Sequence, residues 1–123
     1  MDAGSSSGIR SAEQITISSK YEWEDLWRRH SEKPIPSVDF EKYFVAAVFL
    51  GLRPDSSYGI QILELDKKES QITLKYKDFS RGANERANSR ENFALYTQAV
   101  VYPYIIIKIK KPQYPILFER VYE

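Results

Sequence analysis

Tyr43-Phe44-Val45-Ala46-Ala47-Val48-Phe49-Leu50 is the longest apolar run in the sequence. It has the length of a strand and falls well short of the roughly 18 apolar residues that cross a membrane. Successive side chains of a strand point to opposite faces, so a run that is apolar at every position predicts burial on both faces. We therefore expect a strand at the centre of the fold here.

A helix start signal precedes this strand. Ser19 and Glu22 have the spacing of a capping box, in which each side chain satisfies a backbone N–H of the other residue. The apolar residues that follow at helical spacing are Trp23, Leu26 and Trp27. They form one stripe, so the sequence predicts a helix over residues 20–30 whose indoles belong to the core. A ligand platform is the alternative use of the same two indoles.

Alternating apolar and polar residues predict strands on both sides of the helix and the central run. The expected strands are 13–18, 43–50, 58–65, 72–76, 93–101, 103–110 and 116–122. The second of these is the buried one, and the third and fourth form a hairpin through the polar connection 66–70. Along 103–110, the inward residues are Ile105, Ile107 and Ile109, and the outward residues are Lys108 and Lys110. We expect an α+β fold that is mainly antiparallel β. It is a curled sheet of six to seven strands, or a small sandwich, with one N-terminal helix packed on it.

The composition indicates one globular domain without bulk attraction for polyanions. The chain has 123 residues, of which 42% are hydrophobic and 28% charged. Eighteen Lys and Arg against seventeen Asp and Glu give a net charge of +1, which argues against a nucleic-acid partner. Residues 1–8 are small and polar and are expected to form a flexible tether. Residues 9–123 are expected to form a single monomeric domain without a transmembrane segment.

Few residues are suited to catalysis or metal binding. Cysteine is absent and His30 is the only histidine, so zinc would need carboxylates for its other ligands. We expect His30 to be solvated at the end of the helix, where positive charge suits the helix dipole. Glu64 and Asp66 are the nearest pair of carboxylates, and solvated side chains at a strand end are the simpler interpretation. We therefore expect no catalytic residue, no metal and no cofactor, and interpret the chain as non-enzymatic.

The loop from Gly51 to Tyr58, called here the 51–58 loop, is the strongest candidate for partner binding. Arg53 and Tyr58 are residue types that anchor protein interfaces, while an ordinary turn is the simpler alternative. If the strands run up and down in order, this loop, the long loop 78–92 and the turn 111–115 share one end of the sheet. Loops grouped on a rigid scaffold are common binding sites. The candidate partner-binding residues are Arg53, Pro54, Asp55, Tyr58, Arg81, Arg86, Arg90 and Tyr114.

A series of short motifs follows in a fixed order along the chain. They are Tyr21-Glu22-Trp23-Glu24-Asp25-Leu26-Trp27, Pro36, Val38-Asp39-Phe40, Val45-Ala46-Ala47-Val48-Phe49-Leu50-Gly51, Pro54, Tyr58, Ile60-Gln61-Ile62 and Pro103-Tyr104-Ile105-Ile106-Ile107-Lys108-Ile109-Lys110. In this order and spacing they resemble the PrcB C-terminal domain family, named after a protease-complex subunit, over roughly residues 9 to 120. The family's loop before the tyrosine is usually Gly-rich, whereas this chain has Asp55-Ser56-Ser57 there.

The resemblance implies an accessory domain of a protease-associated complex outside the cytoplasm, where the protein is secreted, periplasmic or lipid-anchored. From it we expect a non-catalytic domain that binds a protein, with a protease as one candidate partner. The alternative is a protease inhibitor that acts through the 51–58 loop. Small inhibitors that resemble chagasin use a loop of the type Pro-Thr-Thr-Gly-Tyr, and Pro54 and Tyr58 have that spacing. A carboxylate hydrolase is a distant third.

Overall fold

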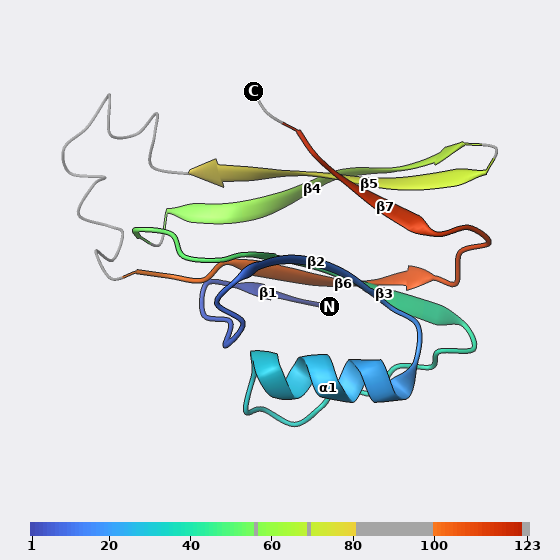
Figure 1. Cartoon of the computed structure of the whole chain (residues 1–123), viewed down its shortest axis with the longest axis horizontal. Helices are drawn as coiled ribbons and strands as arrows, with labels where there is room; N and C mark the ends of the chain where they lie inside the picture. The colour runs from blue at the N-terminus through green and yellow to red at the C-terminus, as the bar shows by residue number, and fades with distance from the viewer. Residues whose placement is uncertain (56, 69, 81–99, 122–123) are drawn as a thin grey trace.

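The computed structural model describes residues 1–55, 57–68, 70–80 and 100–121, which form three layers (Figure 1). The elements are β1 (Asp2–Gly4), β2 (Ala12–Ile17), α1 (Lys20–His30), β3 (Tyr43–Leu50), β4 (Tyr58–Lys68), β5 (Gln71–Ser80), β6 (Tyr104–Lys110) and β7 (Ile116–Arg120). One sheet has the order β1-β6-β3-β2 and the other β4-β5-β7. The helix covers the outer face of the first sheet (Figure 1). The expected mainly antiparallel fold with one helix is confirmed, and its strands are divided between two open sheets.

The central strand β3 is buried on both faces, as its unbroken apolar run predicts. Val45, Ala47 and Phe49 pack with the helix in one core cluster. Ala46 and Val48 face the opposite way and pack against the second sheet. β3 lies between β2 and β6 and pairs antiparallel with both. β3 therefore contributes side chains to two core layers, one on each face of the first sheet.

The helix begins at the predicted cap, but only half of the capping box forms. Ser19 has extended backbone, and its hydroxyl accepts the N–H of Glu22 at 3.3 Å. The Glu22 carboxylate accepts the hydroxyls of Ser19 and Ser18, at 2.9 and 3.3 Å, in place of a backbone N–H. The N-terminal end of α1 is therefore held by a cluster of two hydroxyls and one carboxylate.

Both indoles of the helix lie in the core, which confirms the core interpretation. Trp23 and Trp27 are 2% and 4% exposed. Their Nε1–H groups donate to the carbonyl oxygens of Pro36 and Lys33, at 2.7 and 2.8 Å. Because a buried indole needs a partner for this one donor, the segment after the helix is fixed against it. Buried and hydrogen-bonded rings of this kind leave no face for a ligand platform.

The hairpin and the closing strand form the second sheet. β4 and β5 pair antiparallel over more residues than predicted, with a register shift between Ile62 and Glu64. β7 pairs with β5 in parallel, with Ile72 opposite Ile116. Since β6 belongs to the first sheet, the turn that follows it carries the chain across to the second sheet (Figure 1).

The strand β6 is buried on more of its surface than its alternation predicts. Ile105, Ile107 and Ile109 face the second sheet as predicted. Ile106 is also buried, at 0% exposure, and packs in the cluster on the helix side. β1 and β3 cover the two edges of β6, whereas the helix layer covers one of its faces and the second sheet covers the other.

Residues 1–8 differ from the flexible tether that the composition favours. β1 pairs with the outer edge of β6, and Tyr102 N–H donates to the Ser5 carbonyl at 2.8 Å. Gly8 N–H donates to the His30 carbonyl, also at 2.8 Å. A Cβ at Gly8 would lie 2.5 Å from the Arg29 carbonyl oxygen, so only glycine allows this close approach. The small residues of this segment therefore allow it to pack closely against β6 and the end of α1.

Candidate partner-binding site

The 51–58 loop lies where β3 ends and β6 begins. Arg53 and Val101 exchange two backbone hydrogen bonds of 2.9 Å, and Leu50 N–H donates to the Pro103 carbonyl at 3.1 Å. Gly51 opens the loop with a φ of 77°, in the left-handed region that favours glycine. The backbone of the loop is thus paired with the segment that enters β6.

Arg53, the expected anchor, directs its guanidinium into the domain. Its Nε and Nη2 donate to Oδ2 of Asp78 at 3.1 and 2.7 Å. Its Nη1 donates to the carbonyl oxygens of Leu50 and Leu52. Arg120 also donates to Asp78 Oδ2, at 2.9 Å, and the Asp78 side chain is only 8% exposed. The described contacts of Arg53 therefore brace the loop against β5 of the second sheet.

Asp55 also stabilises the loop from within. Its side chain accepts the N–H of Ser57 at 2.9 Å, and both residues are buried. An aspartate that bonds the backbone two residues ahead forms a turn by itself, so Asp55 can stabilise this turn without the glycines expected from the resemblance. Tyr58 opens β4 opposite Ser80 and is partly buried.

The exposed surface of the loop belongs to residues beside the expected anchors. Pro54 is exposed, as expected for a contact residue. Leu52 is 56% exposed, and so is Val100, the residue before the backbone partner of Arg53. The sequence analysis did not single out Leu52. An apolar residue directly after the turn glycine could have indicated a contact residue, since the turn itself does not need an apolar side chain. Leu52, Pro54 and Val100 form what we call the loop patch.

The expected grouping of three loops at one end is wrong for the turn 111–115. Lys110 at the end of β6 lies opposite Tyr43 at the start of β3, so this turn and Tyr114 lie at the other end of the sandwich. The up-and-down order fails because β6 is the direct antiparallel neighbour of β3. The expected strand 93–101 lies outside the described residues except at its last two positions, and so do Arg81, Arg86 and Arg90.

Comparison with known families decides the relationship. A sequence model of the PrcB C-terminal family matches residues 44–110, which is more than half of the chain. The chain belongs to the PrcB C-terminal family. The match includes β3 from its second residue, the 51–58 loop, the β4–β5 hairpin and β6. No curated protein and no solved structure matches the chain.

His30 in this PrcB C-terminal domain is buried, so the expectation of a solvated helix end is wrong. It is 4% exposed, and its ring lies against Trp27 and Tyr104, with centroid distances of 5.0 and 4.3 Å. Its Nδ1 bonds the Ser7 hydroxyl at 2.8 Å, and its Nε2 lies 3.2 Å from Oδ2 of Asp2. The signal was present in the sequence, because His30 follows Trp27 at helical spacing on the same stripe.

The Ser7, His30 and Asp2 side chains are of the types found in hydrolase triads, but their arrangement is structural. Ser7 is 4% exposed, and its hydroxyl already accepts the N–H of Ile9 at 3.0 Å. The N–H of Gly8 donates to the His30 carbonyl. The two backbone donors next to the hydroxyl are thus both used, whereas acyl transfer needs donors aimed at a developing oxyanion. The cluster joins residues 1–8 to the end of the helix.

The other candidate carboxylates are also paired. Lys75 Nζ lies 3.1 Å from Glu64 Oε1 and 3.8 Å from Asp66 Oδ2. The hydrogen bond to Glu64, followed by its charge, raises the pKa of Lys75. Across the described part of the chain, no group of three or more His, Cys, Asp or Glu side chains is placed to hold a metal ion. In the same residues, no helix is long and apolar enough to cross a membrane.

Proposed function

We propose that this domain is a non-catalytic protein-binding accessory domain of a protease-associated complex outside the cytoplasm. Membership of the PrcB C-terminal family supports the association with a protease complex. The observation that carries the binding role is the bracing of the 51–58 loop at Arg53, beside the exposed apolar side chains of Leu52 and Pro54.

The bracing matters because ordering a loop on binding costs free energy. Arg53 ties the loop to Asp78, the Asp55–Ser57 bond closes its turn, and the backbone of Arg53 pairs with Val101. A loop that already has its bound shape loses little conformational entropy when a partner docks. Exposed apolar side chains next to one another are typical of interaction sites. The loop patch therefore has both the rigidity and the surface that a protein contact requires.

A protease inhibitor remains the second candidate, and the same bracing favours it. An inhibitory loop must enter a protease cleft without rearranging, and preorganisation provides this. Pro54 is exposed on the loop, while Tyr58 is partly buried at the start of β4. The inhibitor hypothesis thus depends on Pro54 and Leu52 more than on Tyr58.

The test is affinity capture from the native cell envelope with the intact domain and with Leu52→Asp as baits. We expect Leu52→Asp to lose the partner, because the substitution puts a charge into an apolar contact. Leu117→Asp is the matched control, since Leu117 is 49% exposed on β7 and lies outside the loop. Equal capture by the intact domain and Leu52→Asp, with melting curves unchanged, would remove the loop patch from the interface.

The same material separates the two candidate functions. The purified domain is added to the captured protease, and turnover of a peptide substrate is measured. An accessory domain leaves turnover unchanged, whereas an inhibitor blocks it at sub-micromolar concentration. Inhibition that disappears with Leu52→Asp would replace the accessory role by the inhibitor role.

A further inference from the structure

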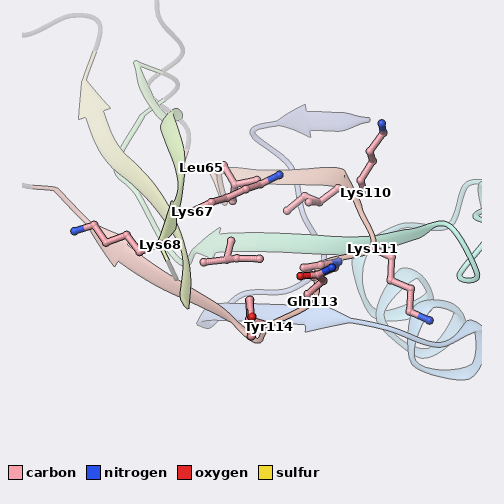
Figure 2. A pocket seen from close by; sticks show the side chains of 10 residues that line it. Leu65, Lys67, Lys68, Lys110, Lys111, Gln113 and Tyr114 are labelled. Atoms are coloured by element: carbon pink, nitrogen blue, oxygen red, sulfur yellow. The ribbon is translucent and has the colours of Figure 1, made fainter. Parts of the chain in front are cut away.

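A concave surface lies at the end of the sandwich opposite the loop patch. It is a cleft of about 350 Å³ between the end of the β4–β5 hairpin and the turn after β6 (Figure 2). The apolar residues that line it are Leu65, Ile72, Ile109 and Pro112. They come from both sheets and from the turn that joins them, so the cleft is the open end of the inner core layer. We call it the hairpin cleft.

Four lysines contribute to the lining of this cleft. They are Lys67, Lys68, Lys110 and Lys111. Lys67 lies opposite the buried Ile72 in the β4–β5 ladder, so it occupies an inward-facing position at the mouth of the cleft. In Figure 2 its side chain extends toward the β6 side of the cleft, whereas Lys68, Lys110 and Lys111 extend outward from it. Lys68 also lies 3.8 Å from Asp66.

The other three lysines carry positive charge that the described residues do not neutralise. Within ranges 1–55, 57–68, 70–80 and 100–121, Lys67, Lys110 and Lys111 form no ion pair of 4.0 Å or less. The whole chain has a net charge of only +1, so this concentration is local. A lysine at an inward position keeps its stem on apolar surface and its ammonium at the rim. The hairpin cleft thus combines an apolar floor with a cationic rim.

We propose that the hairpin cleft binds an acidic peptide segment that inserts one apolar side chain. The apolar floor favours a hydrophobic group, and the volume lies at the lower end of the roughly 300–1,000 Å³ typical of ligand pockets. The cationic rim is complementary to carboxylates on either side of that group, which sets orientation and association rate. This inference rests on the proposed protein-binding function, and it adds a second contact at the opposite end from Leu52.

The test is a titration of the full chain with the peptide acetyl-Glu-Asp-Glu-Phe-Asp-Glu-amide, followed by chemical-shift changes or calorimetry. We expect saturable binding that weakens as salt rises, because part of the attraction is screened. Lys67→Glu combined with Lys111→Glu is expected to raise the Kd about tenfold or more. Lys20→Glu is the matched control, since Lys20 is exposed at the start of the helix, and we expect its Kd to stay within about twofold.

A second peptide with serine in place of phenylalanine tests the apolar floor. We expect its Kd to be raised about tenfold, since its side chain gains little from apolar burial. Absence of saturable binding by the first peptide, equal binding of both peptides, or an equal loss with Lys20→Glu would each overturn the proposal.

The same titration distinguishes this proposal from the proposed function. Leu52→Asp is expected to bind the phenylalanine peptide with an unchanged Kd, because Leu52 is on the other end of the sandwich. If the peptide fails to bind while Leu52→Asp still loses the captured partner, the hairpin-cleft inference is wrong and the proposed function stands. If the peptide binds and Leu52→Asp captures the partner normally, the loop patch is not the interface and the hairpin-cleft inference stands.

Discussion

The two faces of the four-stranded sheet are packed in different ways. On the helix face, one continuous cluster contains both indoles, and the buried polar atoms of Trp23, Trp27 and His30 each have a partner. On the other face, the core is divided into two smaller clusters, one of which contains the buried Tyr76. One end is closed by the Arg53–Asp78 ion pair, and the other opens as the hairpin cleft. We therefore expect the helix layer to contribute more to stability than the second layer does.

Trp27→Ala tests the helix layer and should have the largest effect. Removal of this indole should lower the free energy of unfolding by about 3–5 kcal/mol, because it leaves a cavity in the continuous cluster. Urea denaturation followed by circular dichroism measures it. Tyr21→Ala is the control on the same helix, since Tyr21 is 81% exposed, and should change stability by less than about 0.5 kcal/mol. Similar losses in the two variants would mean that the helix layer is not the stabilising one.

Asp78→Ala tests the closed end of the second layer. Two guanidinium groups, those of Arg53 and Arg120, would lose their shared carboxylate. Because both arginines are partly exposed, we expect a loss of about 2–4 kcal/mol, at or below the full cost of breaking a buried ion pair. Asp25→Ala, at an exposed position of the helix, is the control. A loss of less than about 0.5 kcal/mol would show that the bracing of the 51–58 loop is weak.

Local sequence patterns predicted the elements well because each pattern is complete within one segment. The apolar run gave the bounds of β3, and the cap with its stripe gave those of α1. The burial of Ile106 was missed, because it depends on the helix layer packing over that face of β6. The parallel pairing of β7 was missed for the same kind of reason, since it depends on a crossing between sheets.

The candidate site was predicted less well, because its chemistry depends on residues far apart in the chain. Arg53 is of a residue type that anchors interfaces, yet it meets Asp78, which Arg120 also contacts, only after the two sheets pack. Tyr114 was grouped with the loop by an assumed strand order that the antiparallel β3–β6 pair replaces. Residue type thus singled out this loop as a candidate but misjudged which of its side chains face outward.

Tyr104 provides a pH test of the boundary between the helix layer and β1. Burial, with the Asp2 carboxylate beside it, raises the pKa of Tyr104 from 10.0 to about 12. Below pH 10 the phenol is protonated in both the folded and the unfolded chain, so it does not affect stability. Between pH 10 and 12 the unfolded chain releases this proton first, so stability falls as pH rises.

We expect this group to lower stability by about 1 kcal/mol or less at pH 11 relative to pH 9. Tyr104→Phe removes the titrating hydroxyl, so its stability should fall less steeply over the same range. Denaturation midpoints at pH 9, 10 and 11 measure the difference between the two proteins. Identical slopes would mean that the phenol is solvated and that β1 does not cover it.

Substitutions in the hairpin cleft should have the smallest effect on the free energy of unfolding. They contrast with substitutions at the end of the sandwich that the Arg53–Asp78 ion pair closes. Lys67→Glu combined with Lys111→Glu removes cations that form no ion pair among the described residues. Surface charges without a partner contribute little to stability, so we expect a change within about 0.5 kcal/mol. The measurement is the same urea denaturation used for Asp78→Ala. A large loss would show that these lysines hold the two sheets together, and a gain would indicate that they repel one another in the folded domain. Near-neutrality together with lost peptide binding is the result that marks these lysines as serving recognition and not folding.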